Sequence, residues 1–202
     1  RMPAGLFIES GQADLLLISY LGIDSLNCGK RAYRLLGSEL TFHGDLPKPG
    51  DTLTYQIQVD GHAQHGDIRL YFFHYDCTIN GELRLSVRNG QAGFFTKEEL
   101  AHSQGNVFDA HEASYCKAPR LDPPRFECEG HCFDATRLGA WSGGDLVGCF
   151  GPSFGLAQTH TRPPTARVGT HSFLQEVLDF QPQGGPKGRG YLKAHTRLTG
   201  QE

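Results

Sequence analysis

Glu9 is the side chain whose type and position could most readily do chemistry. It is a carboxylate near the start of residues 6–23, a segment that is otherwise predominantly apolar. Desolvation raises the pKa of a carboxyl group, whereas the dipole of a helix N-terminus lowers it. Two interpretations therefore stay open: Glu9 is a general acid, or it is a first-turn partner of the helix dipole. Asp14 in the same segment is expected to be solvated or to cap a backbone group.

Four possible metal ligands lie close together in the sequence, namely Cys116, Cys128, His131 and Cys132. Thiolate and imidazole groups in this number could hold a tetrahedral zinc ion. Structural zinc sites usually contain paired Cys-x-x-Cys elements, and the spacing here is irregular. We therefore predict that the four side chains do not converge on one point, that the cysteines are reduced thiols of a linker, and that the chain binds no metal.

Two glycine-rich segments have the spacing of known catalytic or binding loops. Residues 151–155, with Ser153 at the centre, match a nucleophile elbow, but an elbow needs a parallel sheet and a following helix. Pro163-Pro164 comes soon after it, which argues against a serine hydrolase. Residues 184–190 look like a phosphate-binding loop, but no helix follows that could present its amide groups. We predict a hairpin loop there.

The histidines give weaker signals. His62 and His65 flank a polar segment that we predict to be a loop, so both are expected to be solvated. His43 and His74 lie within or beside apolar strand patterns and are expected to pack on a sheet.

The elements that must position these side chains begin with a helix. We predict it over residues 7–21, because the segment is apolar on most faces, Pro3 precedes it and Gly22 follows it. The pattern then changes to that of strands, and Asn80-Gly81 predicts a two-residue type I′ turn. A helix followed by successive strands indicates an α+β fold with an antiparallel meander. The predicted strands are 36–42, 52–59, 68–79, and 83–87 continued by 91–95.

The second half of the chain is less regular. Thr96 and Glu99 have the spacing of a capping box, which predicts a short helix. Three prolines between residues 109 and 125 predict a linker. A weak helix is expected over 134–147, broken at Gly143-Gly144. Two further strands are expected at about 172–180 and 190–198, either completing the same sheet or belonging to a second unit.

Composition excludes several classes of protein. The chain has 202 residues, 38% hydrophobic and 20% charged, which fits a soluble globular protein rather than a disordered one. A formal charge of -3 gives no basic field for nucleic acid. No apolar run is long enough to span a membrane. Six cysteines in a chain of this length indicate reduced thiols and a cytoplasmic location, and the Arg-Met start suggests an excerpt of a longer polypeptide.

Several segments together resemble a known family. Met2-Pro3-Ala4-Gly5-Leu6, with Glu9 following, is similar to the start of the central helix in the hotdog-fold β-hydroxyacyl-acyl carrier protein dehydratases. The likeness is strongest to the dehydratase region of the polyunsaturated fatty acid synthases, which are similar to polyketide synthases. It covers about four fifths of the chain and continues through residues 18–22, 40–47, 54–55, 79–82, 90–95, 96–100, 146–150 and 184–194.

The resemblance implies a fold and a division of the chain. The fold would be a hotdog, in which an antiparallel sheet wraps a long central helix, and the chain would be a fragment of a tandem or double hotdog. Residues 1–97 would form a hotdog unit without its first strands, 98–132 a linker with a short helix, and 133–202 the amino-terminal part of the next unit.

The resemblance also implies a function. A dehydratase of this family converts 3-hydroxyacyl-acyl carrier protein thioesters to enoyl thioesters in fatty acid or polyketide synthesis, with or without double-bond isomerisation. Glu9 would be the catalytic acid, Gly5 and Leu6 would contact the substrate, and no cofactor would be needed. Partners would be the carrier-bound acyl chain and neighbouring hotdog units, with no nucleic acid and no membrane span.

The family's catalytic histidine belongs just before the Met-Pro start, a position that this sequence does not contain. The isolated fragment is therefore expected to be inactive. The competing hypothesis is a structural hotdog unit without catalysis that pairs with an active dehydratase unit.

Overall fold

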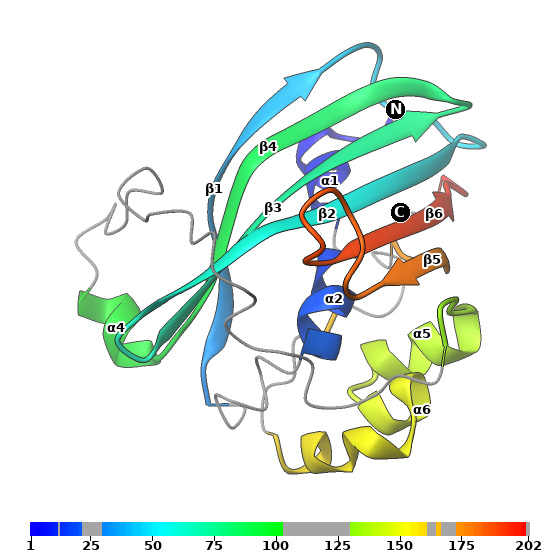
Figure 1. Cartoon of the computed structure of the whole chain (residues 1–202). Coiled ribbons are helices and arrows are strands. Elements are labelled where there is room, and N and C mark those ends of the chain that lie inside the picture. Colours follow the sequence, from blue (N-terminus) through cyan, green and yellow to red (C-terminus); the bar gives the residue numbers. More distant parts are fainter. Residues whose placement is uncertain (12, 22–29, 103–129, 161–164, 167–172, 201–202) are drawn as a thin grey trace.

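The chain forms an α+β structure built around one antiparallel sheet, as the sequence predicts (Figure 1). The structure is a computed structural model that describes residues 1–11, 13–21, 30–102, 130–160, 165–166 and 173–200. The six strands have the order β1-β4-β3-β2-β6-β5. They are β1 (Ala32–Phe42), β2 (Thr52–His65), β3 (Ile68–Ile79), β4 (Glu82–Phe95), β5 (Glu176–Gln181) and β6 (Tyr191–Arg197). The helices are α1 (Ala4–Glu9), α2 (Asp14–Leu21), α4 (Lys97–His102), α5 (Ala135–Ser142), α6 (Leu146–Phe150) and the 3₁₀ helix η1 (Pro152–Thr159).

Helices α1 and α2 lie against one face of the sheet, which we call the inner face (Figure 1). Leu16, Leu17 and Ile18 of α2 have no exposed surface, and neither do Tyr55 and Ile57 of β2. Alternate residues of a strand point to opposite faces, so these β2 residues share the inner face with the odd-numbered residues of β3 from 71 to 79. The hydrophobic core therefore lies between the helices and the inner face.

The predicted single helix over residues 7–21 is wrong: the chain forms α1 and α2 with a break between them. Gly11 lies against Tyr75 of β3, where an added Cβ would stand 2.6 Å from the phenol oxygen. The Gly11 N–H donates to Ile8 O at 3.2 Å, which is a tighter turn than the α-helical one. Glycine is a poor helix former, and this contact with the sheet fixes the position of the break.

Strands β2, β3 and β4 form a meander, and the turn between β3 and β4 lies at Asn80-Gly81, as the sequence predicts. Asn80 and Gly81 have positive φ angles of 53° and 82°, and Ile79 pairs with Glu82 across the turn. Residues 83–87 and 91–95 belong to one continuous strand, β4. The capping box is also confirmed, because the Thr96 hydroxyl accepts from Glu99 N and the Glu99 carboxylate accepts from Thr96 N.

The predicted loop over residues 60–67 is wrong, because β2 continues to His65. A register shift between Val59 and Gly61 reverses the alternation, so that His62 turns inward opposite Tyr71. His62 is 4% exposed rather than solvated as predicted, and its ring lies edge-on to Tyr71. The bulge explains the error, since it turns the polar residue His62 toward the interior.

The last two strands extend the same sheet in this structure. β6 pairs antiparallel with β2 from Thr52 opposite Arg197 to Gln58 opposite Tyr191, and β5 pairs with β6. The hairpin loop predicted at residues 184–190 connects them. The division of the chain into units at residues 97 and 132 stays a prediction.

Short helices cover the region beside β5 (Figure 1). The predicted helix over 134–147 is present with its break, as α5 and α6, and Asp134 caps the first by accepting from Arg137 N. Trp141 of α5 donates its indole N–H to Ser19 Oγ of α2 at 3.1 Å, which ties these helices to the core. Within the part of the chain that the structure describes, no helix has the length and apolar character needed to cross a membrane.

Candidate functional site

Glu9 lies at a cleft of about 370 Å³ between the end of α1 and the inner face of the sheet. The side chain of Glu9 is exposed, and β1, one of the two edge strands, supplies much of one wall. The lining is formed by Ile8, Glu9, Gly11, Tyr33, Arg34, Leu35, Ser38, Leu40, Phe73, Tyr75, Val87, Thr165 and Ala166.

The lining combines apolar surface with one carboxylate. Phe73, Leu40 and Val87 offer surface that a hydrocarbon chain could contact, because apolar walls with few polar groups are typical of small-molecule sites. Glu9 can donate or accept a proton there, and Arg34 supplies a positive charge. No histidine or cysteine occurs among the described residues that line the cleft.

The residue after Glu9 is held by buried hydroxyl groups. Ser10 Oγ donates to the carbonyl oxygen of Phe7 at 2.6 Å and also contacts the phenol oxygen of Tyr55. A serine hydroxyl has one hydrogen, so Tyr55 is the donor in the second contact. Burial raises the pKa of Tyr55 well above its usual value, which keeps the phenol protonated. Burial likewise raises the pKa of the adjacent Cys77 thiol to about 12.

The residue before Glu9 also contacts the sheet. Tyr75 Oη donates to the carbonyl oxygen of Ile8 at 3.3 Å, and the Tyr75 ring lies edge-on to Tyr55. Gly11 leaves the space that this ring occupies. Two strands, β2 and β3, therefore fix the backbone on both sides of Glu9.

Gly5 and Leu6 lie on α1 before Glu9, and neither is among the residues that line the cleft. Gly5 is exposed, and a Cβ added there would meet nothing within 4 Å. Leu6 is half-buried against the edge of the core. The first bond of the helix runs from Phe7 N to Pro3 O, so the N–H groups of Gly5 and Leu6 precede the helical ladder.

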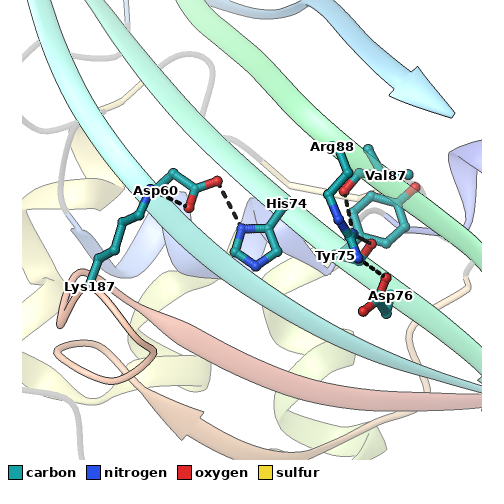
Figure 2. A network of polar contacts seen from close by, with 7 residues as sticks. All are labelled: Asp60, His74, Tyr75, Asp76, Val87, Arg88 and Lys187. Atoms are coloured by element: carbon teal, nitrogen blue, oxygen red, sulfur yellow. Dashed lines mark hydrogen bonds and ion pairs between the residues drawn. The ribbon is translucent and has the colours of Figure 1, made fainter. Parts of the chain in front are cut away.

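A separate polar network lies on the opposite, outer face of the sheet (Figure 2). Asp60 contacts His74 Nδ1 at 2.8 Å and Lys187 Nζ at 3.1 Å. Burial alone would raise the pKa of Asp60, but the hydrogen bonds and charges of His74 and Lys187 outweigh it and lower that pKa. Arg88 pairs with Asp76 at 2.7 Å. Sequence analysis missed Asp60 because it placed this residue in a loop.

Of the other candidates from the sequence, those that the structure describes are not among the residues that line the cleft. Cys116 and Cys128 lie outside the described residues. His131 Nδ1 is 3.2 Å from Phe180 O, and Cys132 Sγ is 3.1 Å from Leu178 O. Among the residues that the structure describes, no group of three or more His, Cys, Asp or Glu side chains could hold a metal ion.

His43, His74 and Ser153 also lie outside the lining of the cleft. His43 follows β1 and lies 3.0 Å from Ser86 Oγ, and His74 belongs to the outer-face network. The side chain of His65 lies outside the described residues. Ser153 is exposed in η1, and Leu146–Phe150 before it is helical rather than a strand, so the strand that an elbow requires is missing there.

The sequence of this chain is similar to part of a known protein. No family model matches the sequence. The chain is 52% identical over 123 residues to one of the polyunsaturated fatty acid synthase subunits of Thraustochytrium sp.. It is related to a region of a polyunsaturated fatty acid synthase. The match covers 59% of this chain and 8% of its relative, so the chain spans a small part of the length of that protein.

Proposed function

We propose that this chain is part of a dehydratase region that converts 3-hydroxyacyl thioesters of acyl carrier protein to enoyl thioesters, with or without double-bond isomerisation. The synthase protein to which it is similar supports a role in fatty acid synthesis. The observation that carries the dehydratase proposal is the position of Glu9, an exposed carboxyl group at a cleft whose lining is partly apolar.

The proposed fold is a hotdog, as part of a tandem of such units. Its support is the antiparallel six-stranded sheet with α1 and α2 on its inner face. The central helix of this hotdog would be interrupted at Gly11, so that Glu9 ends the first segment rather than lying within a continuous helix.

The proposed reaction removes water from the 3-hydroxyacyl chain. A base takes the proton from the carbon next to the thioester, and the electron pair of that bond forms the new carbon–carbon double bond. The carbon–oxygen bond breaks, and Glu9 donates a proton to the departing hydroxyl, which leaves as water. Elimination of water changes no overall oxidation state, so the step needs no redox cofactor.

The base is proposed to come from a neighbouring unit. No histidine is among the described residues that line the cleft, and in this proposal the base enters from a second unit. The cleft lies beside β1, an edge strand on which Leu35, Leu36, Leu40 and Phe42 are exposed. Such an edge can pair with another strand and would then bring a second unit next to Glu9.

Gly5 and Leu6 are proposed to bind the thioester end of the substrate. Their N–H groups precede the helical ladder and could donate to the thioester oxygen as negative charge develops on it. Open space around Gly5 would allow the close approach that this requires. The carrier protein that delivers the substrate and a cytoplasmic location complete the proposal.

The test is the rate of enoyl-thioester formation by the longest natural polypeptide that contains this chain. Glu9→Gln keeps the size of the side chain but removes proton donation, so we expect the rate to fall by about 10² to 10⁴-fold at unchanged thermal stability. Glu98→Gln, on the exposed helix α4, is the matched control and should leave the rate unchanged.

The same assay separates the two candidate roles. The isolated chain should show little or no activity, because in this proposal the base comes from a neighbouring unit. If Glu9→Gln has the wild-type rate in the longer polypeptide, the dehydratase assignment of this cleft is wrong. The chain would then be a structural unit that pairs with an active one.

A further inference from the structure

Tyr55 is buried beneath the end of α1 and contacts the residue that follows Glu9. It has no exposed surface and belongs to β2, one of the two central strands of the sheet. Its phenol donates to Ser10 Oγ, which donates in turn to Phe7 O at 2.6 Å. A chain of two hydrogen bonds therefore runs from the sheet through Ser10 to the last turn of α1.

This link matters more here than it would for a long helix. α1 has six residues, and a helix of this length is unstable by itself because few of its residues gain a hydrogen bond for the conformational freedom they lose. Glu9 is its last residue and lies at an open cleft. The buried Phe7 ring and the bond from Tyr75 Oη to Ile8 O hold α1 on the sheet before Glu9, and the contact at Ser10 holds the backbone directly after it.

The two tyrosines that hold the backbone before and after Glu9, Tyr75 and Tyr55, differ in their contact with the cleft. Tyr75 lines the cleft, so a change there would alter the cleft surface as well as the backbone of α1. Tyr55 is not among the lining residues. Its hydroxyl therefore affects the cleft through Ser10 and the backbone rather than by touching a molecule bound there.

We propose that Tyr55 is a positioning residue that sets the place of the Glu9 carboxyl through its hydrogen bond to Ser10. The inference rests on the proposed role of Glu9 as the acid. The hydroxyl of Tyr55 acts on the rate of proton donation and not on the affinity for the substrate, since it lies outside the cleft.

Tyr55→Phe tests this role, because it removes one oxygen and leaves Ser10 able to donate to Phe7. In the longer polypeptide we expect kcat to fall about 5- to 50-fold with KM within about two-fold, since a misplacement of 1 Å can cost about 10²-fold. Tyr71→Phe is the matched control: Tyr71 is also fully buried on the inner face, but its ring contacts His62 and Phe73. Its kcat should stay at the wild-type value.

A double-mutant cycle with Glu9→Asp distinguishes positioning from general stability. Aspartate has the same carboxyl group on a shorter side chain, so Glu9→Asp already misplaces that group. Tyr55→Phe should therefore lower kcat less in the Glu9→Asp variant than in the wild type. If the two changes multiply independently, or if Tyr55→Phe keeps the wild-type kcat, Tyr55 has no positioning role. If Tyr55→Phe does not fold, Ser10→Ala breaks the same link and should show the same selective loss of kcat.

Failure of this inference can be told from failure of the proposed function. Loss of activity in Glu9→Gln together with a normal kcat in Tyr55→Phe refutes the positioning role and keeps the acid. A normal rate in Glu9→Gln refutes the acid, and the positioning role with it.

Discussion

The two faces of the sheet hold different kinds of polar contact. On the inner face, Ser10 and Tyr55 beside Glu9 are neutral hydroxyl groups. On the outer face, Asp60 contacts His74 and Lys187, and Asp76 pairs with Arg88 (Figure 2). Ser10 and Tyr55 satisfy each other where water is excluded. Asp60, His74 and Lys187 form their contacts where solvent reaches them. Burying a charge costs far more than burying a hydroxyl, and the division follows from that difference. Glu9 is thus a carboxylate on the helix side of the sheet that avoids this cost by standing at an open cleft.

The boundary between the two arrangements lies within β2. Before the register shift, Tyr55 faces the helices; at the shift, Asp60 faces outward and His62 turns inward. One irregular position therefore lets a single strand supply both an acidic residue to the outer network and an aromatic ring to the core.

The largest effect on stability is expected at Gly11, on the inner side. Gly11→Ala places a Cβ 2.6 Å from the Tyr75 oxygen, and the buried ring has little room to move. We expect a loss of about 1–3 kcal/mol in the free energy of unfolding, typical of overpacking. Urea denaturation measures it, and Gly37→Ala is the control, because a Cβ there meets nothing within 4 Å. Equal stability of the two variants would show that the contact does not constrain the break.

A smaller effect is expected on the outer face. Asp60→Asn removes the charge that holds His74 and Lys187, and we expect a loss of about 1 kcal/mol at about pH 7. Asp76→Asn breaks a more exposed pair and should cost less than about 0.5 kcal/mol. If Asp76→Asn costs as much as Asp60→Asn, burial does not decide the strength of these pairs.

The pH dependence gives the same comparison a second test. Because the native pKa of Asp60 is lowered, its contribution to stability is present above the unfolded-state pKa of about 4. The contribution is lost as the pH falls through the lower native pKa. The stability difference between wild type and Asp60→Asn should therefore shrink between about pH 4 and pH 2. A difference that stays constant over this range would contradict a lowered pKa.

The smallest effect on stability is expected at Gly5. A substitution there also tests whether this residue contacts the thioester of the substrate. Gly5→Ala meets no atom within 4 Å and should stabilise α1 by up to about 1 kcal/mol. If a thioester approaches the backbone at this point, the new methyl group should raise KM by about three- to ten-fold. Gly139→Ala in α5, also in open space, should show the stability gain without the change in KM. Unchanged KM in Gly5→Ala would remove Gly5 from the substrate site.

The sequence predicted those parts of the fold that depend on local chemistry. Asn80-Gly81 accepts positive φ at low cost, and the reciprocal bonds of Thr96 and Glu99 need no distant partner. The break at Gly143-Gly144 was predictable for the same reason. In each of these cases the residues involved lie within four positions of one another.

The parts that the sequence did not predict depend on tertiary contacts. The break between α1 and α2 is set by Tyr75, a residue far away in the chain. The inward orientation of His62 depends on a register shift between Val59 and Gly61, and the polar residues of this segment give no sign of that shift. Glu9 could be found by its residue type in an apolar segment, but Tyr55 could not, because a tyrosine in a strand pattern does not reveal which hydroxyl it will meet.

The strand order has a consequence for how the chain folds. β2, β3 and β4 are joined by short turns and can pair as soon as they are made, whereas β6 pairs with β2 from the opposite end of the chain. Contacts between distant segments form slowly, because a long loop must close before they stabilise the structure. During synthesis the free edge of β2 therefore exposes unpaired backbone groups until residues 191–197 arrive, and until then this edge is open to pairing with a wrong strand.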